Sequence, residues 1–307
     1  MNGRTVKIEP PDSLQLNQWI IALSEQYEGL LDVSVIGSSL LGNSIYSLHI
    51  GSNRRNVLYC GGVHGREWIT SLLLVYFAED LLCACKNRRT ICDIDVCRLL
   101  ENGGLTIVPA LNPDGIAISL HGTGVDGLEE LLGDKLTEQI RCEKDYRRWK
   151  ANARGVDINR NFDAGWDAMR SMAMERGIYG PSPEGWTGEY PVSEPETRAA
   201  TQLCERERFR HLIVFHSAGE EIYWSYSHFT PPKAHIMAKI LSMSSGYTLS
   251  EPDRTASAAG FKDWFMEKYS LPAFTVEIGR GNSPLSLDCF PFLYNRLKEM
   301  LVLGIAV

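Results

Sequence analysis

The sequence predicts an α/β fold in which helices cover both faces of a largely parallel sheet. Short, continuously apolar runs rich in β-branched residues alternate along the chain with longer helical patterns, and such runs are typical of strands buried on both faces. Hydrophobic residues make up 44% of the 307 residues, which is enough for a large core. The sequence shows no internal repeat and no low-complexity linker. We therefore expect a single domain over residues 1–307.

The first half of the chain contains two predicted strands and one predicted helix. Asn56–Val63 (NVLYCGGV) is expected to form a buried strand, and Leu105–Leu111 (LTIVPAL) a second one. Between them, Ile69–Ala84 has the pattern of a helix. Glu79 and Asp80 interrupt its apolar stretch, so we expect a buried core helix and not a membrane span.

The second half supplies the remaining predicted elements. Ser193 and Glu196 have the spacing of a capping box, which predicts a helix from Ser193 to Arg206. The other expected elements are strands over His211–His216 and Ala273–Ile278 and helices over Pro232–Ser245, Phe261–Lys268 and Asp288–Leu303. Long loops are expected over Ile116–Arg141 and Asp163–Pro191, and loops of this length usually serve a functional site.

Charge and cysteine content exclude several classes of protein. The formal net charge is -7, which argues against nucleic acid as a partner. The N-terminus MNGRTVKIEPPDSLQLNQW has no apolar core after its positive charges, so we expect no secretory signal. The eight cysteines are expected to be reduced and mostly buried. Cys83, Cys85, Cys92 and Cys97 are close in sequence, but their spacing matches no paired zinc pattern. We therefore predict a cytoplasmic protein.

Candidate metal ligands stand at the ends of two predicted strands. His64 and Glu67 lie in GGVHGREW, directly after the first strand, and His216 ends the strand HLIVFH. Open α/β sheets bind ligands at the carboxyl ends of their strands, so the three side chains can converge on one ion. Two imidazoles and a carboxylate suit Zn²⁺ and leave a position for water, as in catalytic zinc sites. The alternative is that both histidines are only hydrogen-bonded to the backbone.

Glu277 and the pair Asn159 and Arg160 are the next candidates. Glu277 ends the apolar strand AFTVEI, where a carboxylate is costly unless it has a task or a partner such as Arg280. Beside water activated by zinc, it can act as a general base and then as a general acid. Asn159 and Arg160, in GVDINRNF, combine an amide with a guanidinium fork and can bind a carboxylate. The alternative for Arg160 is a surface residue in a polar turn.

These segments, in this order, resemble the zinc metallocarboxypeptidase family. The resemblance begins with IGSSLLGNSIY and continues through HGREWIT, NPDG, DINRNFDAGW, SEPET, FHSAGEE and GFKDWF to FTVEIG. It implies an α/β/α sandwich around a mixed sheet of about eight strands. It also implies that His64, Glu67 and His216 bind one Zn²⁺ and that Glu277 is the general acid/base.

The resemblance assigns substrate contacts to further residues. Asn159 and Arg160 fall on the pair that grips the terminal carboxylate of the substrate, and Arg66 falls on another substrate-binding arginine. Lys150 stands where digestive members have an arginine that polarises the scissile carbonyl, and a lysine can stabilise an oxyanion as a point charge. Arg147 or Arg148 could assist it.

Other departures from the digestive members point to the substrate. A tyrosine of those members is missing from the segment 254–260, and Ala218 replaces a second one. Lys262 stands where the family's pocket selects a side chain, and a cation there favours an acidic group. With these changes, the chain is similar to the bacterial branch that hydrolyses γ-D-glutamyl–diaminopimelate bonds in cell-wall muropeptides. Lys262 could meet the second carboxylate of diaminopimelate, and Glu220 or Glu221 its amine.

Three alternatives remain open at this point. The chain could be an exopeptidase that removes acidic C-terminal residues, a relative that has lost catalysis, or an amidohydrolase acting on acylated amino acids. No pro-segment and no membrane partner are expected. A cytoplasmic enzyme of muropeptide recycling fits these expectations.

Overall fold

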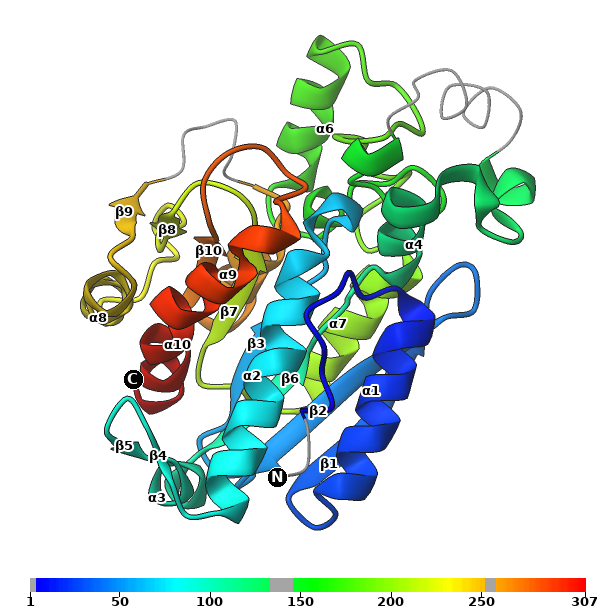
Figure 1. The fold of residues 1–307 in the computed structure, drawn as a ribbon. Coiled ribbons are helices and arrows are strands. Elements are labelled where there is room, and N and C mark those ends of the chain that lie inside the picture. The colour runs from blue at the N-terminus through cyan, green and yellow to red at the C-terminus, as the bar shows by residue number, and fades with distance from the viewer. Residues whose placement is uncertain (1–3, 133–145, 252–257) are drawn as a thin grey trace.

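The computed structural model describes residues 4–132, 146–251 and 258–307. These residues form a mixed sheet of eight strands in the order β1-β2-β6-β3-β7-β10-β8-β9 (Figure 1). The four strands β6, β3, β7 and β10 are mutually parallel, whereas β1 and β2 continue the sheet in antiparallel pairs at one edge. β8 is antiparallel to β10, and β9 is parallel to β8. The predicted α/β class is confirmed, with the parallel strands in the centre of the sheet.

The strands of the main sheet contain between three and eight residues. In chain order they are β1 (Leu31–Ser38), β2 (Ser44–Gly51), β3 (Val57–Cys60), β6 (Gly104–Val108), β7 (Leu212–His216), β8 (Glu221–Tyr223), β9 (Thr248–Ser250) and β10 (Ala273–Glu277). A separate hairpin consists of β4 (Thr90–Ile91) and β5 (Ile94–Asp95).

Helices pack on both faces of the sheet, because successive side chains of a strand point to opposite faces. Val57 and Tyr59 belong to one core cluster, and Leu58 and Cys60 belong to the other. The first cluster is covered by α1 (Ser13–Gln26), α2 (Ile69–Lys86), α3 (Val96–Asn102), α8 (Ala234–Ser245) and α10 (Phe290–Ala306). The second is covered by α7 (Pro195–Arg206) and α9 (Phe261–Tyr269).

The predicted elements of both halves are present, with boundaries shifted by a few residues, but the two expected loops contain helices. α4 (Pro113–His121) enters the first loop, and α6 (Trp166–Glu175) lies inside the second. Each is short, so its pattern is difficult to separate from that of an irregular segment. Part of the first loop, and residues 254–257 of the segment without a tyrosine, lie outside the described residues.

The predicted capping box at Ser193 is wrong. α7 begins after Glu194, which makes no side-chain cap, and the Ser193 hydroxyl donates to the Glu194 carboxylate at 2.8 Å. Glu196 is fully buried and accepts a hydrogen bond of 3.2 Å from the Asn152 amide. The carboxylates of Glu194 and Glu196 therefore both accept hydrogen bonds from the buried Asn152 amide.

α2 runs through the core from one end of the sheet to the other (Figure 1). The helical segment Gly65–Lys86 is long and apolar enough to cross a membrane, but 78% of its most apolar stretch of 18 residues is buried inside the fold. Burial in the protein accounts for this composition, as expected for a core helix. α6 lies near the end of the sheet where α2 begins, whereas α3 and the β4–β5 hairpin lie at its other end (Figure 1).

Candidate active site

Three metal-binding side chains converge at the carboxyl ends of two parallel strands. His64 immediately precedes η1 (Gly65–Glu67), the short helix that follows β3. Glu67 is the last residue of η1, and His216 is the last residue of β7. Nδ1 of His216 lies 3.1 Å from Nδ1 of His64 and 2.9 Å from Oε2 of Glu67. Nδ1 of His64 lies 2.9 Å from Oε1 of Glu67. The predicted ligand set is therefore one compact cluster.

The cluster has the dimensions of a zinc site. Tetrahedral Zn²⁺ with bonds of about 2.0–2.1 Å to nitrogen and oxygen has ligand atoms roughly 3.3 Å apart. All three side chains are buried, and two imidazole Nδ1 atoms facing one another at this distance suit a shared cation. Among the described residues, this is the one group of three or more His, Cys, Asp or Glu side chains that could hold a metal ion.

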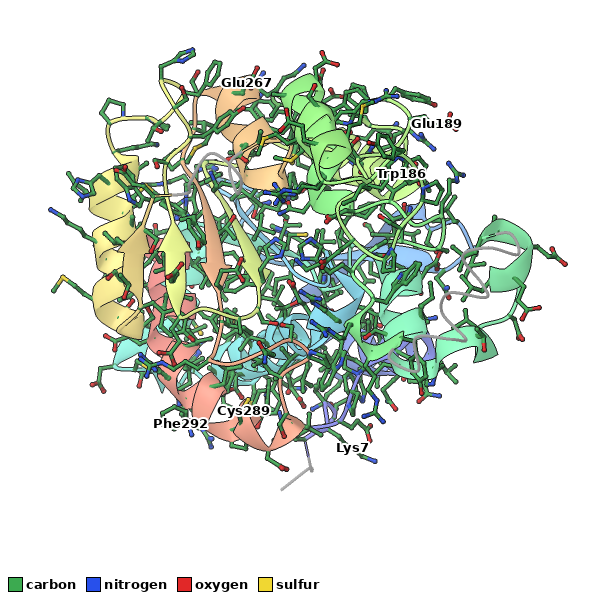
Figure 2. The ribbon with its side chains drawn as sticks, turned by 90° about the horizontal axis from the view of Figure 1, so that it is seen from above. Lys7, Trp186, Glu189, Glu267, Cys289 and Phe292 are labelled. Atoms are coloured by element: carbon green, nitrogen blue, oxygen red, sulfur yellow. The ribbon has the colours of Figure 1, made fainter. Side chains whose placement is uncertain are left out.

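Asp157 fixes the orientation of His64. Its Oδ1 lies 3.2 Å from Nε2 of His64, and its backbone N–H donates to the carbonyl of Trp186 at 2.8 Å. Trp186 lies between α6 and α7, on the side of the molecule that also carries Glu267 of α9 (Figure 2). A carboxylate that accepts the second ring N–H of a histidine leaves Nδ1 free to bind metal. We therefore add Asp157 to the candidate site.

Glu67 and His216 have pKa values shifted toward their metal-binding states, whereas the pKa of His64 is shifted toward its protonated form, which zinc would have to displace. Burial alone would raise the pKa of Glu67, but His64 and His216 outweigh it and hold that pKa well below its usual range. Burial would lower the pKa of His64, but the Glu67 and Asp157 carboxylates raise it. Burial lowers the pKa of His216, which favours the neutral imidazole that a metal requires.

Glu277 lies beside this cluster because of strand register. It is the last residue of β10 and pairs directly with His216 of the parallel neighbour β7. Burial and the Glu67 carboxylate raise the pKa of Glu277 to about 8. A divalent cation at the ligands would counteract the repulsion from Glu67 and lower this pKa. The position and the raised pKa suit a side chain that exchanges a proton near pH 7.

A cavity of about 390 Å³ opens in front of the ligands. Its walls combine the ligands with basic, acidic and small polar side chains. The lining includes His64, Arg66, Glu67, Lys150, Asn159, Arg160, His216, Ser217, Glu221, Tyr223, Lys262, Asp263, Thr275, Glu277 and Ser283. A site in which charges of both signs meet around a candidate metal centre suits a small, highly charged ligand.

Two predicted carboxylate-binding residues line this cavity from η4 (Ile158–Arg160). The Oδ1 atom of Asn159 accepts a hydrogen bond of 3.1 Å from the backbone N–H of Phe261, which leaves the amide N–H donors for a ligand. Arg160 donates to the carbonyl of Ala258 at 3.3 Å and has four further N–H donors. Arg66 also lines the cavity and lies 3.5 Å from the exposed carboxylate of Glu184.

The remaining three basic candidates, Lys150, Arg147 and Lys262, have different surroundings. Lys150 lines the cavity, and its backbone is fixed because its carbonyl accepts the N–H of Gly65 at 3.1 Å. Arg147 does not line the cavity and is exposed on η3 (Tyr146–Arg148), so its predicted substrate contact is not supported. Lys262 lines the cavity but is paired with Asp263.

Lys262 lies in the cavity, as the sequence predicts, and its binding of a substrate carboxylate stays a prediction. Its ammonium donates to the Asp263 carboxylate and to the carbonyl of Ser225 at 2.8 Å. A lysine ammonium has three donors, so one remains for a ligand. The sequence placed this cation correctly, but it did not show that the adjacent Asp263 offsets the charge.

Comparison with known proteins identifies the family of the chain. The zinc carboxypeptidase family model matches residues 16–292. A γ-D-glutamyl-L-diamino acid endopeptidase 1 from Lysinibacillus sphaericus is 33% identical over 271 residues, which cover 88% of this chain and 66% of the relative. The uncharacterized protein YqgT of Bacillus subtilis is 32% identical over 269 residues, which cover 87% of this chain and 69% of the relative. The chain thus spans about two thirds of the length of both bacterial relatives.

Solved structures share the fold at lower identity. Bovine thrombin-activatable fibrinolysis inhibitor, in complex with tick carboxypeptidase inhibitor, has a TM-score of 0.75 and 19% identity, with 97% of each chain covered. The murein-tripeptide amidase MpaA of Escherichia coli O157 has a TM-score of 0.52 and 21% identity, with 87% of this chain and 91% of that chain covered.

Proposed function

The chain belongs to the zinc carboxypeptidase family, and from this premise we propose that it hydrolyses a γ-glutamyl amide bond next to a carboxylate-bearing diamino acid. Diaminopimelate in cell-wall muropeptides is the substrate that we favour. The observation that carries this proposal is the single cavity in which the zinc ligands and Glu277 meet a carboxylate-binding pair and a further set of charges.

The chemistry needs zinc, which would be held by His64, Glu67 and His216. When bound by three protein ligands, Zn²⁺ acts as a Lewis acid and lowers the pKa of a coordinated water toward neutrality. Asp157 keeps His64 in the tautomer that presents Nδ1. The ordered ligand cluster means that little reorganisation is required for zinc to bind.

Glu277 carries the proton in the proposed reaction. Its carboxylate accepts a proton from the attacking water and then donates it to the nitrogen of the leaving amine, so that one side chain serves as base and acid. Lys150 lines the same cavity and stabilises the negative charge that develops on the former carbonyl oxygen. Asn159 and Arg160 hold a carboxylate of the substrate and so position the scissile bond relative to Glu277.

The choice of substrate depends on the charges around this machinery. Lys262 offers one donor to a second carboxylate, and the half-buried Glu221 adds a negative charge to the same cavity. A side chain with both a carboxylate and an amine matches this combination better than an apolar or purely basic side chain. The name of the Lysinibacillus relative, a γ-D-glutamyl-L-diamino acid endopeptidase, points to the same chemistry.

The main alternative is an exopeptidase that removes acidic C-terminal residues, since Arg160 and Lys262 would serve it too. Mass spectrometry of the products from a defined muropeptide mixture separates the two. We expect cleavage between γ-D-glutamate and diaminopimelate by the wild type and no cleavage by the Glu277→Gln variant. Release of C-terminal Glu, Asp, Phe or Lys from ordinary peptides, without action on the γ-glutamyl bond, would overturn the proposal.

We also propose that the enzyme acts in the cytoplasm. The described cysteines are all free thiols, as is usual for proteins of a reducing compartment. Fractionation of the source cells with an antibody against the protein tests this proposal, and recovery outside the cytoplasmic fraction would contradict it.

A further inference from the structure

Glu221 is an acidic side chain of the cavity to which the proposed reaction gives no task. It begins β8, whose alternate residues Glu221 and Tyr223 both line the cavity, while Ile222 between them is fully buried in the core. The period of two along a strand explains this arrangement. β8 therefore presents a carboxylate and a phenol to whatever occupies the cavity.

The other acidic side chains that line the cavity are already engaged. Glu67 belongs to the ligand cluster, and Glu277 is the proton carrier. Asp263 is ion-paired with Lys262. Within the described parts of the chain, Glu221 forms no ion pair with a lysine or arginine. A half-buried carboxylate without a counter-ion is costly, which suggests that its counter-ion comes from the ligand.

The neighbouring Glu220 is excluded from this role. Its carboxylate accepts hydrogen bonds from Arg280 and Arg296, each at 2.6 Å, and it does not line the cavity. The sequence left Glu220 and Glu221 as alternatives for binding an amine. The two adjacent acids differ because β8 directs Glu221 alone toward the cavity.

Tyr223 holds the Glu221 carboxylate in place. Its hydroxyl donates to Oε2 of Glu221 at 2.6 Å, which leaves Oε1 for a ligand. Glu221 also pairs directly with Glu277 across the antiparallel β8–β10 ladder. Directly paired residues have Cβ atoms about 4.5–5.5 Å apart, so Glu221 and Glu277 enter the cavity side by side and can contact different parts of one small ligand.

We propose that Glu221, positioned by Tyr223, binds the second ammonium group of a diamino acid in the residue released by cleavage. This inference rests on the proposed function and specifies it. It makes Glu221 a specificity-determining residue. The ammonium group of the substrate supplies the counter-ion that Glu221 lacks, while Lys262 and Arg160 bind the carboxylates of the substrate. A residue without a distal amine would leave Glu221 unpaired and would bind less well.

Three synthetic L-Ala-γ-D-Glu peptides test the inference. Their third residue is meso-diaminopimelate, L-2-aminopimelate, which lacks the distal amine, or L-lysine, which lacks the distal carboxylate. For the wild type we expect kcat/KM to fall on the order of tenfold to a hundredfold from diaminopimelate to aminopimelate. In Glu221→Gln this preference should vanish, mainly through a higher KM for the two peptides that carry the amine.

Two further variants separate recognition from folding. Tyr223→Phe should raise KM for the diaminopimelate peptide and leave the aminopimelate peptide unchanged, as expected for a positioning residue. Glu220→Gln is the matched control, because it removes the charge of the adjacent acid outside the cavity and should leave the substrate preference intact. Zinc content and melting temperature are measured for each variant.

The possible failures are distinguishable. If Glu221→Gln binds zinc, melts cooperatively and keeps the wild-type preference for diaminopimelate, the role of Glu221 is wrong while the proposed function stands. If zinc-loaded wild type cleaves none of the three peptides, the proposed function fails, and the role of Glu221 fails with it.

Discussion

Different kinds of metal-binding side chains lie near the two ends of α2, and among the described residues the geometry of a metal site is present at one of them. At its beginning, Glu67 meets His64 and His216 within hydrogen-bonding distances. At its other end, Cys83 and Cys85 lie close in sequence to Cys92 and Cys97. There Sγ of Cys97 lies 3.7 Å from Sγ of Cys85, but the described residues form no group of three metal ligands at this end.

The difference shows that a metal site forms where parallel strands bring side chains together, and that closeness of potential ligands in the sequence is not sufficient. The zinc ligands come from β7 and from the segment after β3, two parallel neighbours, and the two histidines hold the pKa of Glu67 well below its usual range, so that this ligand is ionised at neutral pH. Burial and the hydrogen bond with Cys97 raise the pKa of Cys85 to about 11. A thiol of this kind is protonated at neutral pH and is a poor metal ligand.

Removal of one ligand should produce the largest effect. His216→Ala takes away one of two imidazoles from a buried cluster, so we expect zinc content to fall from one ion per chain to nearly none and hydrolysis to disappear. Metal analysis after gel filtration and a turnover assay measure both. Cys97→Ala at the other end of α2 is the control and should keep the full zinc content.

Glu277→Gln should separate metal binding from proton transfer. The side chain is outside the ligand set but pairs with His216 in register, so zinc should stay bound while kcat falls by about a hundredfold to ten-thousandfold. Metal analysis and steady-state kinetics on the same sample test this. Substantial remaining activity would show that another group transfers the proton.

Asp157→Asn should have a smaller effect, because it changes the orientation of one ligand and removes none. An amide in place of the carboxylate can hold the wrong tautomer of His64, so we expect zinc affinity or activity to fall about tenfold to a hundredfold. Titration against a competing chelator gives the affinity. An unchanged affinity and rate would mean that the contact of 3.2 Å has no role in the site.

The cysteine end of α2 should give the smallest functional effect. In a Cys85→Ser, Cys97→Ser double variant, we expect zinc content to be unchanged and kcat/KM to stay within about twofold of the wild type.

In the wild type, the raised pKa of Cys85 means that little thiolate is present at pH 8, so alkylation of Cys85 should be slow at that pH. It should accelerate about tenfold for each pH unit up to pH 10, as followed by mass spectrometry.

The sequence predicted the parts of the site that depend on strand ends. His64, His216 and Glu277 each stand where an apolar run stops, and the parallel topology then brings them together. Asp157 escaped prediction because a carboxylate in a polar turn has no distinctive pattern. Its function depends on the position of the loop that contains Trp186, which local sequence does not specify.

The second feature that the sequence could not predict was which residues of a short strand face the cavity. Nothing in GEEIY distinguishes the two adjacent acids until β8 pairs with β10 and fixes which side chains face the cavity. The partner of Lys262 was equally hidden, since adjacent residues of a helix do not normally face one another. Arg147 was predicted from its closeness to Lys150 in sequence, yet η3 leaves it exposed.

His216, Glu277 and Glu221 occupy one lateral row across β7, β10 and β8, because each is paired with the next in register. In evolutionary terms, the row assigns different tasks of the enzyme to different strands, which can change independently. Within the row, one zinc ligand and the proton carrier stand on β7 and β10, whereas the proposed contact with the distal ammonium stands on β8, a strand of three residues. Lineages can therefore acquire new substrates by changing alternate residues of β8, without passing through ancestors that have lost hydrolysis.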